Sequence, residues 1–166
     1  MTDRLGVLSS TGYVVEQARY VHINEERLRA VCAEVEGAVD VPTWNRELHW
    51  AGAPEQTAMY VVVLDTLNFC FWGEPHWQIE YKGHLLDGYW ALAAALRRAI
   101  EEGIPLLEAS YLAEISEADL GHILRGTTII PLFAQRLANL RELGHVLLDK
   151  YSGYCARLIE SAKGDA

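Results

Sequence analysis

The chain has 166 residues and carries 14 Lys and Arg against 23 Asp and Glu, a formal net charge of -9. With 51% hydrophobic and 22% charged residues, it has the composition of a soluble globular protein that is long enough for one core. The acidic balance argues against binding a long nucleic-acid backbone, which requires a surplus of cations on one surface. A small phosphorylated ligand, held by one or two local cations, is compatible with it.

Three cysteines, Cys32, Cys70 and Cys155, are odd in number, widely spaced and set in apolar contexts. This pattern predicts reduced core residues of a cytosolic protein. The chain shows no basic start followed by an apolar run, and no apolar stretch approaches the length that spans a bilayer. We therefore expect a cytoplasmic location and no membrane partner.

The first part of the chain predicts a helix over residues 10–18 and a short extended stretch over residues 20–23. Asn24 is expected to cap a second helix that ends at Gly37, with two acidic residues in its first turn. Residues 41–54 predict an ordered loop because they contain two prolines and a glycine. This loop is also unusually aromatic: it contains Trp44, His49 and Trp50.

Residues 59–72 are apolar on every side, yet they include a carboxylate and an amide. Drawn as a helix, the segment places five residues on one face: Val61, Asp65, Asn68, Phe69 and Trp72. A helix that is apolar all round is normally buried, and an unpartnered buried polar group costs roughly 2 to 7 kcal/mol. If the two polar side chains line an aromatic pocket, hydrogen bonds to a bound ligand would offset that cost. Alternatively, Asp65 and Asn68 cap backbone amides of a neighbouring loop.

Alternating apolar residues from Trp77 to Tyr81, followed by Lys82-Gly83, predict a small hairpin. Gly88 opens a helix that Gly103 ends. The second half of the chain adds three predicted features: a capping box at Ser116 before a short helix ending at Gly126, Pro131 in the first turn of a long helix reaching Lys150, and a further helical segment after Gly153. The long helix is expected to bury an apolar stripe formed by Leu132, Phe133, Leu137, Leu140, Leu143 and Leu147.

Four motifs occur in a characteristic order: LDTLNFCFW over residues 64–72, GYW over 88–90, RAIEEGIP over 98–105 and PLFAQR over 131–136. Their order and spacing resemble the first half of the queuosine salvage glycosylase family. The resemblance implies a mainly α fold, similar to helical DNA glycosylases, to which the alternating residues above add one small β-hairpin. It also implies hydrolysis of the N-glycosidic bond of queuosine 5'-monophosphate, which releases queuine for salvage into tRNA.

The resemblance covers the chain from about residue 21 to its end, and the chain is half as long as family members. The family's Phe-Ala-Asp-Tyr-Arg-like segment, which holds the catalytic aspartate, has no counterpart here. The catalytic residue is therefore left unassigned. We expect residues 1–166 to form a single helical domain or the amino-terminal half of one, with a downstream half of the same protein as a partner.

The implied substrate base is a 7-deazaguanine, which has no ring nitrogen at position 7 to protonate. Its departure calls for hydrogen bonds to the pyrimidine-ring edge and for stacking, beside an oxocarbenium-like sugar. Six residues are the expected substrate-binding set: His49, Asp65, Asn68, Phe69, Phe71 and Trp72. For the sugar and phosphate, the candidates are His49, Arg136 and Lys82.

Each of these residues also has a purely structural interpretation. The aromatic residues occur more often in cores than in ligand platforms, and His49 beside Trp50 can bind a loop carbonyl. Arg136 on a long helix can pair with Glu142 or a neighbouring acid.

The six histidines include no pair at i and i+4, and no Cys-x-x-Cys or Gly-rich phosphate loop is present. We therefore expect no metal and no cofactor, whereas the family resemblance implies a small-molecule nucleotide as the ligand. The alternative function is a non-catalytic helical ligand-binding or protein-interaction module. A helical DNA repair glycosylase would require a basic stripe and a helix-hairpin-helix glycine motif, and the sequence contains neither.

Overall fold

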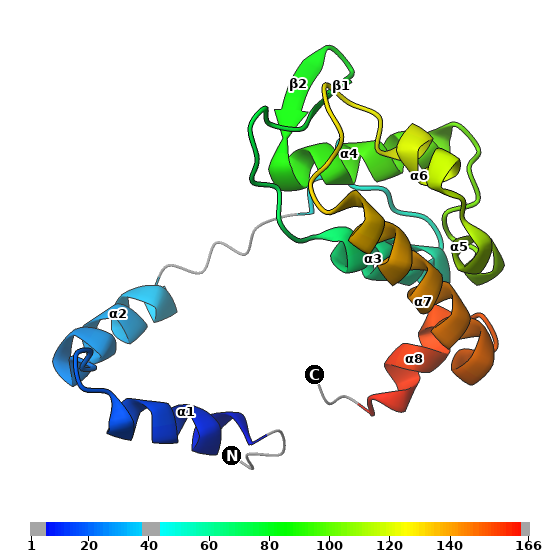
Figure 1. Ribbon diagram of the computed structural model, residues 1–166. Coiled ribbons are helices and arrows are strands. Elements are labelled where there is room, and N and C mark those ends of the chain that lie inside the picture. Colours follow the sequence, from blue (N-terminus) through cyan, green and yellow to red (C-terminus); the bar gives the residue numbers. More distant parts are fainter. Residues whose placement is uncertain (1–5, 38–43, 164–166) are drawn as a thin grey trace. The chain divides into compact units, whose positions relative to one another are not determined.

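A computed structural model describes residues 6–37 and 44–163 (Figure 1). The chain divides into two compact units, Met1–Thr43 and Trp44–Ala166. Each unit is considered by itself below. The expectation of one domain over residues 1–166 stays a prediction.

The first unit contains α1 (Val7–Gln17) and α2 (Glu25–Gly37). The predicted cap of α2 is confirmed, because the Asn24 side-chain oxygen accepts a hydrogen bond from the Arg27 amide at 3.0 Å. Residues 20–23 form no strand.

The apolar positions of α2 do not form a core. Leu28, Val31 and Val35 are each more than half exposed, and Cys32 is exposed as well. The prediction that Cys32 is a core residue is therefore wrong, whereas Cys155 is buried as expected. Two short helices provide too little surface to enclose an interior of their own.

The second unit is mainly α with one antiparallel hairpin, as predicted. Its elements are α3 (Pro54–Leu67), β1 (Gln78–Tyr81), β2 (His84–Asp87), α4 (Gly88–Glu101), α5 (Ala109–Glu114), α6 (Glu117–Ile123), α7 (Phe133–Tyr151) and α8 (Cys155–Ser161). The long helix α7 packs against α3, α5 and α8, while α4 packs against α3, α6 and both strands (Figure 1). The likeness to helical DNA glycosylases stays a prediction.

The hairpin follows the sequence prediction closely. Tyr81 faces His84 across the turn, and both turn residues adopt left-handed backbone angles, with φ of 51° at Lys82 and 80° at Gly83. Ile79 and Tyr81 bury their side chains toward α4, and the Tyr81 hydroxyl donates to Glu101 at 2.9 Å. A hairpin of this size is marginal alone in water, so its packing on α4 stabilises it.

The buried face of α4 consists mainly of small side chains. Residues 91–96 and Ala99 are fully buried, and five of these seven residues are alanines. Small side chains let neighbouring elements approach the helix backbone closely. The helix ends at Glu101, and Gly103 follows at φ 82°, which confirms the predicted end.

The helices after α5 differ from the prediction at their ends. The capping box at Ser116 is confirmed, since its hydroxyl accepts from the Asp119 amide at 3.0 Å, but α6 ends at Ile123 rather than at Gly126. Pro131 precedes α7 instead of occupying its first turn, because Leu132 adopts a left-handed conformation with φ of 55°. Leu132 is consequently exposed rather than part of the buried stripe.

A carboxylate fixes the beginning of α3 to α8. The two oxygens of Glu55 accept hydrogen bonds from the amides of Cys155 and Ala156 at 2.7 and 2.8 Å. These amides open α8 and have no partner within that helix. The side chain thereby joins residues that lie 100 positions apart in the chain.

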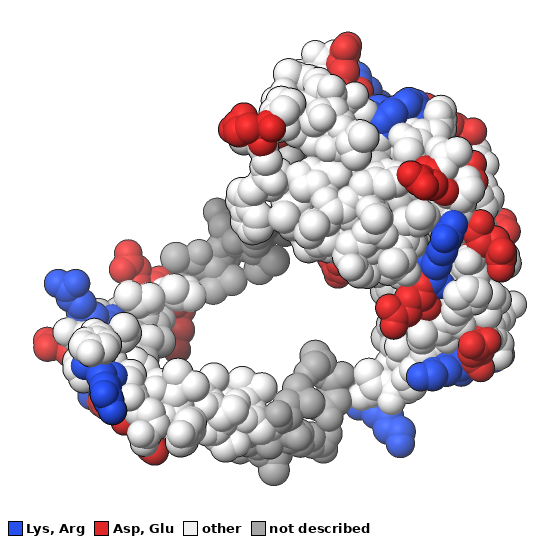
Figure 2. All heavy atoms as spheres, viewed as in Figure 1, with Lys and Arg blue, Asp and Glu red and all other residues white. Residues whose placement is uncertain are grey.

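Among the described helices, none is long and apolar enough to cross a membrane. On the face of residues 44–163 shown in Figure 2, basic and acidic side chains are interspersed around a broad area that contains neither.

The crossing of α5 and α7 generates a stability prediction. A Cβ atom on Gly144 would overlap the backbone of Ala113 and lie 2.8 Å from the Ala109 carbonyl oxygen. We expect Gly144→Ala to lower the free energy of unfolding by about 1 to 3 kcal/mol or more, measured by urea denaturation. Gly121→Ala in α6 is the matched control, because its Cβ would meet only Phe133, at 4.0 Å. Equal stability of the two variants would contradict the prediction.

Candidate functional site

The helix α3 ends earlier than the sequence predicts. It stops at Leu67, and Asn68 follows in a non-helical conformation with its amide donating to the Asp65 carbonyl at 3.2 Å. Four of the six predicted binding residues therefore lie in a loop rather than on one helical face: Asn68, Phe69, Phe71 and Trp72. The prediction of a single helical face through Trp72 is wrong.

The polar residues of this segment are also not buried. Asp65 and Asn68 both expose their side chains to solvent, which overturns the expectation of a buried carboxylate and amide. Hydration by water removes the desolvation cost that the prediction assumed.

Arg136 accounts for the early end of α3. Its guanidinium is fully buried and donates to the carbonyl oxygens of Leu67, Phe69 and Cys70, the last at 2.8 Å. Its Nε donates a fourth hydrogen bond, to the Pro131 carbonyl oxygen at 2.9 Å. Carbonyl groups that a continuing helix would use internally are thus taken by this side chain.

The surroundings of Arg136 fit neither of its sequence interpretations, a contact to the sugar or phosphate or an ion pair with an acid. Its guanidinium carbon lies 4.3 Å from the ring centre of Phe69 and 5.2 Å from that of Phe71, and no acid forms an ion pair with it among the described residues. The structural alternative, an ion pair of Arg136 with Glu142 or a neighbouring acid, is therefore wrong. Burial lowers the pKa of Arg136 to about 10, which still leaves it charged at neutral pH. With four carbonyl partners and two aromatic neighbours, it is poorly placed to bind a phosphate.

His49 lies at the centre of an aromatic cluster. The Trp44 ring stacks on it with centroids 4.3 Å apart, and Trp90 lies 5.7 Å away. Its Nδ1 lies 3.0 Å from the Asn45 carbonyl oxygen, and its Nε2 lies 2.7 Å from the Tyr89 hydroxyl. Because a carbonyl only accepts, we assign the proton to Nδ1, so Nε2 accepts from Tyr89.

Burial favours the neutral form of this histidine. The ring is only 5% exposed, and desolvation lowers its pKa below the ordinary value of 6.5, against the weaker opposing effect of the bond to Asn45. The loop that carries His49 is anchored to α4, because Arg97 donates to the His49 carbonyl at 2.8 Å and pairs with Glu101 at 2.8 Å.

Tyr89 connects His49 with the acidic end of α3. Its pKa is raised, mainly by burial and then by the negative charge of Asp65. Asp65 therefore lies within electrostatic range of the Tyr89 hydroxyl, which itself bonds to His49. Tyr89 thus bonds directly to one predicted residue, His49, and its pKa responds to the charge of a second, Asp65.

The remaining predicted residues divide into two groups. Phe69 and Phe71 are half-buried against the Arg136 guanidinium, so their rings support the loop. Asn68 is exposed, and Trp72 is 82% exposed. Lys82 lies in the hairpin turn and lines a hollow of about 260 Å³ together with Glu47, Leu48, Tyr81 and His84.

Sequence reasoning missed Tyr89 and Arg97, and it noted Trp44 only as part of an aromatic loop. The partners of His49 come from the loop before α3 and from the first turn of α4, which lie 40 residues apart. The aromatic content of residues 44–50 and the Gly-Tyr-Trp sequence at 88–90 were the available signals. No local spacing links the two segments.

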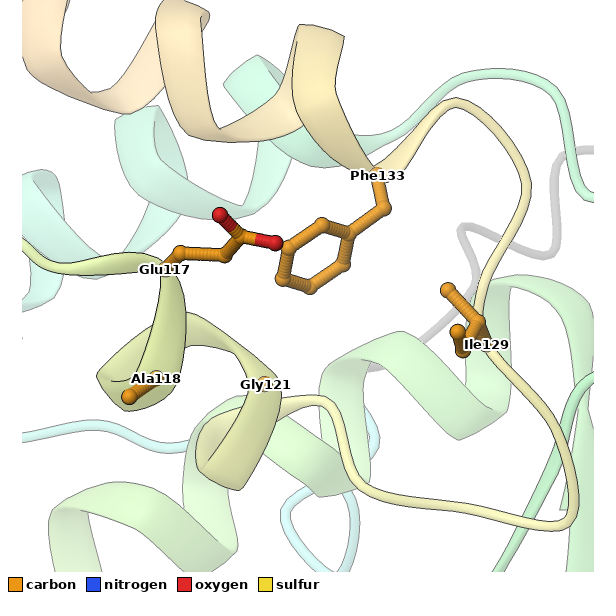
Figure 3. A pocket seen from close by; sticks show the side chains of 5 residues that line it. All are labelled: Glu117, Ala118, Gly121, Ile129 and Phe133. Atoms are coloured by element: carbon orange, nitrogen blue, oxygen red, sulfur yellow. The ribbon is translucent and has the colours of Figure 1, made fainter.

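A separate hollow of about 530 Å³ lies between α6 and the start of α7 (Figure 3). It is lined by Glu117, Ala118, Gly121, Ile129 and Phe133, and the side chains of Glu117 and Phe133 point toward one another. None of the six predicted binding residues is among its described lining residues. In the described part of the chain, no group of three or more His, Cys, Asp or Glu side chains could hold a metal ion.

Comparison with known proteins identifies the family. A model described as queuosine salvage protein matches residues 48–166. The chain belongs to the queuosine salvage protein family. The matched region contains His49, Asp65, Tyr89 and Arg136, whereas the Trp44 and Asn45 partners of His49 lie just before it.

Several curated relatives carry the name queuosine 5'-phosphate N-glycosylase/hydrolase. The protein from Sphaerobacter thermophilus is 52% identical over 162 residues, which cover 96% of this chain and 50% of that protein. The relative from Nematostella vectensis is 42% identical, over 78% of this chain and 39% of its own length. The relative from Bos taurus is 34% identical, over 95% of this chain and 50% of its own length. This queuosine salvage family chain thus spans about half the length of the curated relatives it matches.

The lowered pKa of His49 predicts how the stability of the fold depends on pH. Since its pKa is lower in the folded protein than in the unfolded chain, the unfolded chain binds its proton at higher pH. The stability contributed by neutral His49 is complete above about pH 6.5 and is lost as the pH falls through the folded-state pKa. We expect the free energy of unfolding, measured in urea between pH 7.5 and 5, to fall less steeply in His49→Gln than in the wild type. Parallel pH dependences would refute this.

Proposed function

We propose that this chain supplies the base-binding half of a hydrolase that cleaves the N-glycosidic bond of queuosine 5'-monophosphate and releases queuine for salvage into tRNA. The observation that carries the proposal is the family match over residues 48–166, with relatives named for this activity. A downstream half of the same protein is the proposed partner, in keeping with the length of the relatives. We place the protein in the cytoplasm, in keeping with its unpaired cysteines.

The proposed reaction adds water across one bond. The bond between C1' of the ribose and the base nitrogen breaks, the electron pair leaves with the base, and a proton completes free queuine. The oxygen of water bonds to C1', which yields ribose 5-phosphate. Positive charge develops on the sugar in the transition state, so a carboxylate near C1' and a site that admits the attacking water but excludes bulk solvent favour the reaction.

Recognition of the base is the part that we assign to this chain. The Asp65 carboxylate can accept hydrogen bonds from the amino and ring N–H groups of a guanine-like edge, and the Asn68 amide can both donate and accept. The exposed face of Trp72 offers a stacking surface. The position of Asp65 within electrostatic range of Tyr89 supports a site shared between the end of α3 and the start of α4.

His49 is proposed to act as part of an aromatic platform rather than as an acid or a base. Both of its ring nitrogens already have partners, and its ring stacks on Trp44. Its lowered pKa keeps the ring uncharged at neutral pH. A buried, uncharged ring supports the neighbouring Trp44 and Trp90, which are exposed and can offer their faces to a planar base.

The carboxylate that assists bond cleavage is not assigned within these residues. Asp65 is the only acid in the predicted binding set, and its proposed role is to hold the base edge. The downstream half is proposed to supply the carboxylate for the sugar.

Incubation with queuosine 5'-monophosphate, followed by chromatography for free queuine, tests the function directly. The paired samples are the chain alone and the chain co-expressed with the downstream half of its Sphaerobacter thermophilus relative. We expect queuine to be released only by the paired halves. Release by the chain alone would mean that its own carboxylates suffice, with Asp65→Asn as the first variant to examine.

Absence of release from either sample would instead favour a non-catalytic ligand-binding or interaction module. That second function is supported by the exposure of large apolar side chains, since Trp72 is 82% and Ile129 is 77% exposed.

Binding can be measured separately from turnover. We expect Trp72→Ala to weaken the affinity of the chain for queuosine 5'-monophosphate at least about fivefold, because stacking on an aromatic side chain contributes about 1 to 3 kcal/mol per base. Isothermal titration calorimetry measures the dissociation constant. Tyr154→Ala is the matched control, since Tyr154 is also an exposed aromatic residue but precedes α8. An equal loss in both variants would show that Trp72 has no specific role.

A further inference from the structure

The loop between α3 and β1 that carries Asn68, Phe69, Cys70, Phe71 and Trp72, here named the 68–72 loop, has few backbone hydrogen bonds of its own. The Asn68 amide donates to Asp65 and the Phe69 amide donates to Leu67 at 3.0 Å. The chain then adopts a left-handed conformation at Cys70, with φ of 43°. A non-glycine residue in this conformation requires support from its surroundings.

Arg136 provides that support from a different part of the fold. Three of its four hydrogen bonds go to carbonyl oxygens at the start of this loop: those of Leu67, Phe69 and Cys70. Its planar guanidinium also lies against the rings of Phe69 and Phe71. The planar fork of an arginine satisfies several acceptors at once in fixed directions, which the single ammonium of a lysine does not reproduce.

The two exposed residues of the loop depend on this arrangement indirectly. Asn68 lies between two of the carbonyl groups that Arg136 binds, and Trp72 follows Phe71, which packs on the guanidinium. Arg136 itself is fully buried and cannot touch a ligand at the surface. A loop held in its binding conformation before the ligand arrives binds more tightly, because less freedom is lost on association.

We propose that Arg136 is a positioning residue for ligand recognition: it pre-orders the 68–72 loop so that Asn68 and Trp72 are presented to the base without contacting the ligand itself. The proposal rests on the proposed function only in taking this loop as the base-binding surface. The ordering of the loop is a property of the unliganded chain and is measured without any ligand.

Hydrogen exchange of the unliganded wild type is the first measurement. We expect the amides of Asn68 and Phe69 to exchange slowly, as the interior amides of α7 do. Exchange as fast as at the exposed turn residue Gly83 would overturn the proposal, whatever the variants do. This result does not depend on whether any variant folds or any nucleotide binds.

Arg136→Lys then tests the consequence for binding. We expect faster exchange of the Asn68 and Phe69 amides, unchanged exchange in α4, and at least tenfold weaker affinity for queuosine 5'-monophosphate by calorimetry. Arg136→Met is measured alongside it, as a variant of similar length that buries no charge, with the same expectation. Wild-type affinity in either folded variant would overturn the proposal.

Two control variants separate positioning from stability. Arg141→Lys changes another arginine of α7 that donates to a backbone carbonyl, that of Ile115 at 2.9 Å, and should leave affinity unchanged. Leu140→Ala removes a fully buried side chain from the same helix and should lower stability while the folded protein keeps its affinity. A tenfold loss of affinity in Leu140→Ala would attribute the effect to stability and overturn the proposal. Failure of the wild type to bind the nucleotide would count against the proposed function, with the exchange data still deciding whether Arg136 orders the loop.

Discussion

The burial of an arginine among carbonyl groups is the interaction on which the candidate site depends. An unpaired charge in a protein interior costs several kcal/mol, and hydrogen bonds to a charged donor each return about 1.5 to 3 kcal/mol. Arg136 meets this requirement with four carbonyl oxygens and two aromatic faces rather than with an acid. The same bonds connect α7 to the end of α3. Helix α3 therefore stops at Leu67, whose carbonyl oxygen accepts from the guanidinium, and the loop after it leaves Asn68 and Trp72 exposed.

Elements with local signals were predictable from the sequence. The hairpin turn at Lys82-Gly83, the end of α4 before Gly103 and the capping box at Ser116 each depend on residues within a few positions. Such features depend on backbone preferences and on hydrogen bonds between near neighbours. The residues that determine them therefore lie close together in the sequence. The mainly helical class followed from these elements, as did the position of most helices.

The boundaries and groupings that failed have causes elsewhere in the chain. Residues 64–72 are apolar enough to continue a helix, and nothing within them indicates the arginine almost seventy residues later that ends it. The six predicted binding residues were chosen by chemical type. The fold separates them into a half-buried support for the loop, an exposed pair, His49 bonded to Tyr89, and Asp65 exposed near the end of α3. Contacts across such sequence distances are set by helix packing, which periodicity alone does not specify.

The helix α3 is fixed at both ends by side chains from distant parts of the chain, Glu55 reaching α8 at its start and Arg136 reaching it from α7 at its end. Synthesis proceeds from the amino terminus, so α3 and its loop leave the ribosome well before either partner exists. Until α7 follows, the LDTLNFCFW segment lacks the hydrogen bonds from Arg136 that hold it in the folded protein. Contacts of this range also close slowly, because the intervening chain must first be ordered. Chaperones that bind apolar segments can therefore reach this motif in the nascent protein until α7 and α8 have formed.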